Sequence, residues 1–263
     1  MFPKLLDIGP IHLASYGVFV AAGYLLGILW LKRRREKMGL SEDRFWSLIY
    51  ACFAGAVLGG KLMFITLNWH AYASGELGFF RDFRYGFVFY GGFIGICIAG
   101  FAWAWHDRIP MLSTADYFGA IAPIGHAIGR LGCLAAGCCY GAPTRLPWGL
   151  RFTRTDSLVP DYYRGVPLHP TQLYEAAGNV LIAVLLWRLI KRKEAGGLKA
   201  GVVFFSYIVL YAALRFAVEC LRADDRGGVL LRLSPAQWTA LILGGAALAW
   251  LASARPLTTE RPA

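Results

Sequence analysis

The segment GHAIGRLGCLAAGCCYG, residues 125–141, places a histidine, an arginine, three cysteines and five glycines in a largely apolar run. An apolar run of this kind is typical of a helix that crosses a membrane. A charged residue inside such a helix costs about 2.5–3.5 kcal/mol near the bilayer centre. Arg130 is therefore a candidate functional residue, and the glycines would let a helix or a lipid approach the backbone closely.

The composition of the whole chain also indicates a membrane protein. Of its 263 residues, 57% are hydrophobic and only 16% are charged, whereas soluble domains carry roughly 25% charge. The net charge of +11 could indicate nucleic-acid binding, but the basic residues cluster between hydrophobic runs. This distribution favours anionic membrane lipids as partners and argues against nucleic acid.

The hydrophobic runs predict the fold class. A membrane span needs about 20 mainly apolar residues, and seven runs meet this length. We therefore expect an all-α, polytopic membrane protein with seven transmembrane helices. The runs are 12–31, 45–67, 86–105, 112–136, 171–190, 201–221 and 236–253. The first run lacks the pattern of a cleavable signal peptide, so we expect it to remain as a span.

Basic connectors predict the orientation of these helices. The connectors at 32–37, 106–108 and 191–199 are rich in lysine and arginine, and such connectors stay in the cytoplasm. The N-terminus then lies outside and the C-terminus inside. We expect one integral-membrane domain over residues 1–263, with small extracytoplasmic caps at about 68–85 and 137–170.

Six of the charged residues within the predicted spans are candidates for a functional or structural role: Lys61, Asp116, Arg130, Glu175, Arg215 and Glu219. One interpretation is that they form ion pairs that hold the helices together. Arg215 and Glu219, for example, are four residues apart and share a helical face. The other interpretation is that they line a functional cavity, as intramembrane charges often do.

The predicted orientation favours a cavity near the outer interface. Polar residues from several helices would lie at this one level: Tyr16, Arg130, His169, Tyr174, Glu175, Tyr211, Arg215 and Glu219. Arginine suits such a cavity because its planar fork can bind two phosphate oxygens at once.

Seven short motifs follow one another along nearly the whole chain. They are SYG (15–17), GGKL (59–62), YGGFIG (90–95), DYFGAIAPIGHAIGRLGC (116–133), HPTQLYE (169–175), YAALRFAVECLR (211–222) and LSPAQW (233–238). Together they resemble the motifs of the prolipoprotein diacylglyceryl transferases, which are seven-span enzymes of the bacterial inner membrane. Three positions depart from the family pattern: Tyr90 replaces a histidine, Cys133 an asparagine and Cys138 a glutamate.

The resemblance implies a reaction and its partners. Members of the family transfer the diacylglyceryl group of phosphatidylglycerol to the lipobox cysteine of a prolipoprotein signal peptide. The reaction forms a thioether and releases glycerol phosphate. On this resemblance we expect a multi-pass protein of the bacterial inner membrane that uses neither a cofactor nor a metal.

The same resemblance, with the chemistry of the side chains, suggests site residues. Arg130 and Arg215 would hold the lipid phosphate, Glu175 and Glu219 would orient them, and His169 or His126 would act as base because histidine titrates near neutral pH. The predicted catalytic residues are Arg130, Arg215, His169, Tyr16 and Tyr90. The predicted substrate-binding residues are Arg130, Arg215, Tyr211, Gln172, Glu175, Gly141, Cys133 and Cys138.

Two questions stay open from the sequence. Cys133, Cys138 and Cys139 could serve only as small packing residues, form a disulfide, act as a catalytic thiol or bind a metal. Their C-x4-C-C spacing is not a standard zinc pattern. The three departures also leave room for a non-catalytic lipid-binding or transport protein, or for a transferase with a different thiol acceptor.

Overall fold

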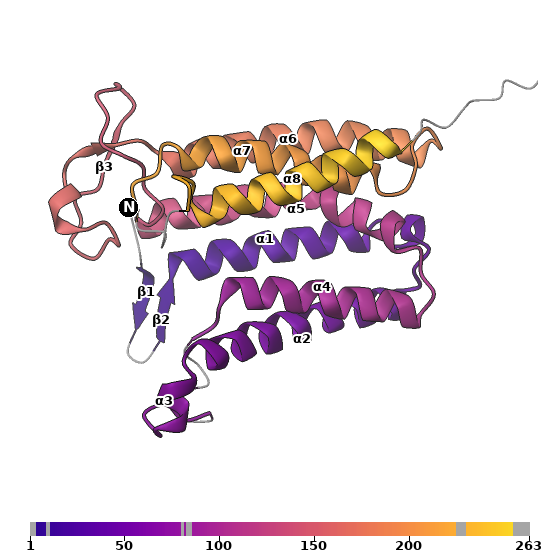
Figure 1. Cartoon of the computed structure of the whole chain (residues 1–263), viewed down its shortest axis with the longest axis horizontal. Helices are drawn as coiled ribbons and strands as arrows, with labels where there is room; N and C mark the ends of the chain where they lie inside the picture. Colours follow the sequence, from indigo (N-terminus) through magenta and orange to yellow (C-terminus); the bar gives the residue numbers. More distant parts are fainter. Residues whose placement is uncertain (1–3, 9–10, 80–81, 83–85, 225–229, 255–263) are drawn as a thin grey trace, which may run out of the picture. The chain divides into compact units, whose positions relative to one another are not determined.

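The computed structural model (Figure 1) describes residues 4–8, 11–79, 82, 86–224 and 230–254. The chain divides into two compact units. The first unit contains Met1–Leu31 and Ala115–Ala263, and the second contains Lys32–Thr114. The expectation of one domain over the whole chain stays a prediction.

The first unit is built mainly from long helices. They are α1 (Ser15–Lys32), α5 (Met111–Ala136), α6 (Thr171–Glu194), α7 (Val202–Glu219) and α8 (Pro235–Ser253). Helix α7 packs beside both α6 and α8 (Figure 1). Before α1, strands β1 (Lys4–Ile8) and β2 (Ile11–Ala14) form an antiparallel hairpin. The predicted start of the first span, at residue 12, therefore falls within β2 and is three residues too early.

The second unit is a helical pair with short connecting elements. Its elements are the 3-10 helix η1 (Glu36–Met38) and helices α2 (Glu42–Leu67), α3 (Trp69–Ala73) and α4 (Phe89–His106). Gly55 and Gly59 of α2 face Gly91 and Gly95 of α4, so closely that a Cβ atom on any of them would meet the opposing helix. Glycines four residues apart let membrane helices approach in this way.

The helices confirm an all-α, multi-pass membrane protein. Within the described residues, six helices are long and apolar enough to cross a membrane: α1, α2, α5, α6, α7 and α8. The remaining predicted run, 86–105, corresponds to the 18-residue helix α4. The count of seven spans and their orientation stay predictions.

Both predicted caps contain short structured elements. The 68–85 segment includes helix α3, but residues 80–81 and 83–85 lie outside the described residues. The 137–170 segment pairs β3 (Leu150–Arg151) with β4 (Pro167–Leu168) and includes the 3-10 helix η2 (Asp161–Tyr163). It has a small hydrophobic core of its own, made by Tyr140, Phe152, Val159 and Leu168.

Asp116, one of the predicted intramembrane charges, ties three helices of the first unit together. Its buried carboxylate accepts hydrogen bonds of 2.8 Å from the backbone N–H groups of Gly201 and Phe204, at the start of α7. It also lies 2.9 Å from Nζ of Lys193, near the end of α6. Asp116 is therefore paired with a lysine from a predicted connector and serves the packing of the helices.

We expect Asp116→Ala to lower the free energy of unfolding by about 3–5 kcal/mol, because it removes the partner of a buried charge and the acceptor for two N–H groups. Asp116→Asn keeps an acceptor oxygen and should lose less. Thermal unfolding of the purified protein in detergent measures both changes. Equal unfolding midpoints for the two variants would show that the hydrogen bonds from Gly201 and Phe204 to residue 116 contribute nothing to stability.

Candidate active site

Arg130, Glu175 and Tyr211 meet inside the first unit, from three different helices. Nη2 of Arg130, on α5, lies 2.9 Å from Oε1 of Glu175, on α6. The hydroxyl of Tyr211, on α7, donates a 3.1 Å hydrogen bond to the same oxygen. Glu175 is only 1% exposed, whereas the Arg130 side chain is 19% exposed. Three predicted site residues therefore come together, with the guanidinium on the more accessible side.

Arg215 forms a second ion pair one turn further along α7. Its Nη1 lies 2.6 Å from Oε2 of Glu219, and the hydroxyl of Ser234 donates a 2.7 Å hydrogen bond to Oε1 of Glu219. Tyr211 and Arg215 are four residues apart and share one face of the helix. The pair confirms that Glu219 contacts Arg215 within α7, and the hydrogen bond from Ser234 joins Glu219 to the start of α8.

Arg222 is a further candidate site residue, which was not among the predicted ones because it follows the predicted span 201–221. Its side chain is only 2% exposed. It forms a bidentate pair with Asp224, with two N–O distances of 2.9 Å, and its Nη1 lies 4.0 Å from Oε2 of Glu175. We refer to Arg130, Glu175, Tyr211, Arg222 and Asp224 as the Glu175 cluster.

A backbone contact explains why Arg222 is buried. The chain turns directly after α7, and the N–H of Ala142 donates a 2.8 Å hydrogen bond to the carbonyl of Leu221. Gly141 and Arg222 form an antiparallel bridge beside this bond. The segment after the cysteines thus holds Arg222 against the cluster. Burial raises the pKa of the Asp224 carboxyl above its usual value, although the adjacent Arg222 opposes the shift.

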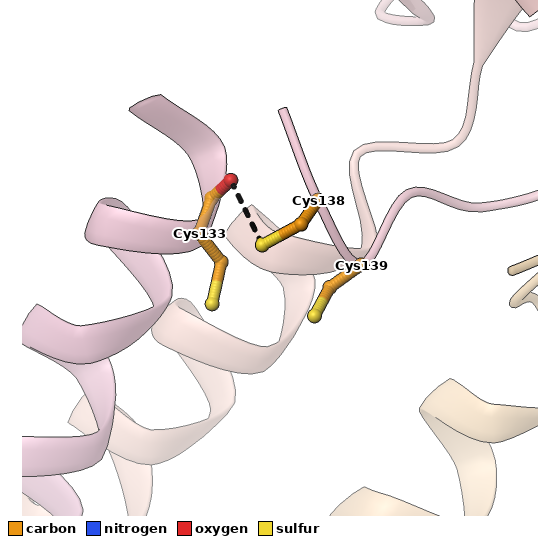
Figure 2. Close-up of side chains that lie close together, drawn as sticks. All are labelled: Cys133, Cys138 and Cys139. Atoms are coloured by element: carbon orange, nitrogen blue, oxygen red, sulfur yellow. Dashed lines mark hydrogen bonds between the residues drawn. The ribbon is translucent and has the colours of Figure 1, made fainter. Parts of the chain in front are cut away.

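The three cysteines lie together at the end of α5 and in the turn that follows it. Their Sγ atoms are all within 4.8 Å of one another (Figure 2). Cys133 is also 4.0 Å from Nη1 of Arg130, so the thiols adjoin the Glu175 cluster. None of the three is in a disulfide. The contacts among the three thiols raise the pKa of Cys138. The same contacts lower the pKa of Cys139, and the nearby Arg222 and Arg130 lower it further.

Gln172 and Thr171, at the start of α6, hold this cysteine turn in place. The side-chain amide of Gln172 donates a 2.7 Å hydrogen bond to the carbonyl of Cys138, and the Thr171 hydroxyl donates one of 2.6 Å to the carbonyl of Cys139. Both side chains are buried. In this structure, Gln172 therefore positions the turn, and its predicted contact with substrate stays a prediction.

The two candidate bases have different surroundings. His126 lies between α5 and α7, where Nδ1 is 3.0 Å from the Tyr207 hydroxyl and the ring centroid is 4.8 Å from that of Tyr211, with the two rings tilted by 49°. His169 is half-buried at the edge of the 137–170 segment, with Nδ1 3.3 Å from the Tyr174 hydroxyl. Both histidines are half-buried, and the contacts of His126 with α7 fit a packing role, which leaves His169 as the candidate base.

The two predicted catalytic tyrosines lie in different units. Tyr16, at the start of α1, packs across α5: a Cβ atom on Gly132 would lie 3.4 Å from the Cα of Tyr16. Tyr16 is 47% exposed and lies beside the part of α5 that carries Arg130. Tyr90 belongs to the second unit, near the start of α4, and is 52% exposed. Its catalytic role stays a prediction.

Gly141 fits a position with no room for a side chain. A Cβ atom there would lie 2.6 Å from Cβ of His169 and 2.8 Å from the carbonyl oxygens of His169 and Leu221. The glycine therefore brings His169 and the Arg222 turn together, and it acts through the backbone.

We expect Gly141→Ala to lower the free energy of unfolding by about 1–3 kcal/mol, because the added methyl group must displace packed backbone. The matched control is Gly129→Ala in α5, where no described atom beyond the adjacent residues and the local helix backbone lies within 4 Å of the added carbon. That change should be neutral or stabilise the helix by about 0.5–1 kcal/mol. Thermal unfolding of both variants tests the contrast, and equal losses would contradict it.

Comparisons with known proteins match one family over nearly the whole chain. The sequence model of the prolipoprotein diacylglyceryl transferases matches residues 3–253. The phosphatidylglycerol–prolipoprotein diacylglyceryl transferase of Clostridium tetani is 33% identical over 241 residues, which cover 92% of this chain and 93% of the relative. The enzymes of that name from Cupriavidus metallidurans and Nostoc are 30% and 32% identical, over 94% and 99% of this chain.

Proposed function

We propose a function that follows from one premise: this chain belongs to the prolipoprotein diacylglyceryl transferase family. The chain transfers the diacylglyceryl group of phosphatidylglycerol to a prolipoprotein cysteine. The acceptor is the lipobox cysteine of a signal peptide in the bacterial inner membrane. The observation that carries the proposal is Arg130, a partly exposed guanidinium fixed by the buried carboxylate of Glu175.

The reaction requires a thiolate acceptor, stabilisation of the charge on the phosphate, and a lipid held with its reacting carbon towards the sulfur. The acceptor thiol must lose its proton, because the thiolate is the nucleophile. The thiolate sulfur then bonds to the terminal carbon of the diacylglyceryl group, and the bond from that carbon to the phosphate oxygen breaks. The electron pair of this bond leaves with glycerol phosphate, so negative charge increases on the phosphate as the bond breaks.

Arg130 holds that phosphate in the proposed mechanism. One edge of its fork is fixed by Glu175, while 19% of the side chain is exposed. A pre-oriented guanidinium stabilises charge that develops in the transition state more than charge already present in the substrate. Arg215 is proposed to contact the same headgroup, and Tyr211, on the shared face of α7, positions the two arginines.

His169 is proposed as the base that accepts the thiol proton. It is half-buried and lies on the segment that Gly141 joins to the Arg222 turn. The hydroxyl of Tyr174, which is 3.3 Å from Nδ1, orients its ring. Tyr16 is proposed to line the lipid entrance. The proposed site uses neither a metal nor a cofactor for transfer.

The test is transfer by the purified protein in liposomes that contain phosphatidylglycerol, with a synthetic lipobox peptide as acceptor. Mass spectrometry is expected to show a peptide heavier by one diacylglyceryl group, with release of glycerol phosphate. A peptide with serine in place of the lipobox cysteine is the control and should stay unmodified.

Two outcomes would overturn this function. Lipid that binds with no thioether product would favour a non-catalytic lipid-binding protein. A diacylglyceryl group found on Cys133, Cys138 or Cys139 of the protein, with the peptide unmodified, would favour a different thiol acceptor.

A further inference from the structure

The cysteine turn has the geometry of a ligand set. Figure 2 shows the three sulfur atoms of Cys133, Cys138 and Cys139 at the corners of a small triangle. All three sulfur–sulfur separations are within 4.8 Å. An ion bound in the plane of three sulfurs at about 2.3 Å from each would set them about 4.0 Å apart. Small rotations of the side chains therefore suffice to close the triangle around an ion.

The backbone holds these side chains in place with several independent contacts. The N–H groups of Gly137 and Cys138 donate hydrogen bonds of 3.0 and 3.1 Å to the carbonyl of Cys133. Cys139 has a φ of 61°, which is uncommon for a residue other than glycine. Together with the hydrogen bonds from Gln172 and Thr171, these contacts pre-organise the turn before any ion binds.

A positive charge beside the cysteine turn suits the anionic site that three metal-bound thiolates would form. A half-buried anion is costly unless an opposite charge lies nearby. Nη1 of Arg130 is 4.0 Å from Sγ of Cys133 and supplies such a charge. The cysteines are also accessible enough to load, since Cys138 and Cys139 are half-buried rather than fully enclosed.

The ligand chemistry narrows the choice of ion. A set made only of thiolates selects soft metals such as Cu(I) and zinc. Structural zinc sites almost always have four ligands, whereas the group found among the described residues consists of three cysteines with no histidine or carboxylate. Cu(I), unlike structural zinc, does not require a fourth ligand, so three thiolates can complete its coordination shell.

We propose that Cys133, Cys138 and Cys139 form a three-coordinate Cu(I) site at the end of α5. The proposal does not rest on the proposed transfer reaction, because its test measures metal binding rather than activity, although Cys133 adjoins Arg130 of the Glu175 cluster. Its main competitor is a disulfide between two of the thiols, which would remove two ligands at once.

The experiment titrates the reduced, purified protein with Cu(I) under anaerobic conditions, in competition with a chromogenic Cu(I) chelator. We expect one ion per chain, and at least a tenfold loss of affinity in each of Cys133→Ser, Cys138→Ser and Cys139→Ser. Cys220→Ser, which changes an exposed cysteine of the same unit, is the matched control and should bind like the wild type.

X-ray absorption of the copper-loaded wild type keeps the test valid even where a serine variant fails to fold. A first shell of three sulfur atoms supports the site. No binding by the reduced protein, nitrogen or oxygen in the first shell, or an affinity unchanged by all three substitutions would overturn it. Isolated protein that carries a disulfide and still fails to bind Cu(I) after reduction would also overturn it.

Discussion

Replacing Arg130 by alanine is expected to lower kcat/KM for diacylglyceryl transfer at least about 100-fold, because a pre-oriented donor to the developing charge is lost. The change should act mainly on kcat, since charge on the phosphate increases as the bond breaks. The measurement is the initial rate of peptide modification in phosphatidylglycerol liposomes. Arg130→Lys keeps the charge but loses the planar fork, so we expect an intermediate rate.

The loss at Arg130 must be separated from a folding defect. Arg130→Ala alone leaves Glu175, which is only 1% exposed, without its nearest guanidinium, and an uncompensated buried charge is strongly destabilising. The double variant Arg130→Ala with Glu175→Gln removes that charge. We expect this variant to regain stability while it stays as inactive as Arg130→Ala.

The opposite pattern would contradict the proposed role. If the double variant regained most of the wild-type transfer rate, Arg130 would serve only to neutralise Glu175. The phosphate would then have to be held elsewhere, and Arg215 would be the remaining candidate.

Replacing Arg222 by alanine is expected to cause the largest loss of stability among the arginines, about 3–5 kcal/mol. Its side chain is 2% exposed and lies between two carboxylates, at 2.9 Å from Asp224 and 4.0 Å from Glu175. The variant would leave both acids with one fewer cation in a buried setting. Thermal unfolding in detergent, followed by circular dichroism, measures the change.

Arg154 provides a matched control for Arg222. It forms the same bidentate pair with an aspartate two residues later, Asp156, at 2.9 and 3.0 Å. Its side chain, however, is 48% exposed, and exposed ion pairs contribute little to stability. Arg154→Ala should unfold close to the wild type. Similar losses in the two variants would show that burial does not set the strength of this pairing.

The membrane helices could be predicted from sequence because hydrophobic length is a local property. The predicted runs 112–136 and 236–253 differ by one residue at most from α5 and α8. The ends follow from local signals too, such as Ser234, whose side chain forms a capping box with Gln237. The hairpin before α1 could not be predicted in this way, because its strands pair through backbone groups.

The partners of the intramembrane charges could be predicted only in part. Arg215 and Glu219 pair as their spacing indicated, because i and i+4 lie on one helical face. The partners of Asp116 and Arg222 depend on how distant segments pack. Lys193 belongs to the end of α6, and Arg222 is buried because the segment at Gly141 pairs with it. No short-range pattern in the sequence carries that information.

The cysteines show the same limit. The spacing C-x4-C-C matches no standard zinc motif, and the sequence left packing, disulfide, catalysis and metal binding open. The structure adds what the spacing lacks: α5 ends at Ala136, and Gly137, with a φ of 78°, turns the chain back. Cys138 and Cys139 thereby come close to Cys133.

The central claim, that Arg130 holds the phosphate of phosphatidylglycerol, can be measured directly by solid-state NMR. Protein with 13C- and 15N-labelled arginine is placed in phosphatidylglycerol bilayers without acceptor peptide, and dephasing of guanidinium carbons by lipid phosphorus is recorded. We expect a dephased signal that is present in the wild type and absent from Arg130→Lys. A dephasing pattern that is identical in the two proteins would contradict it.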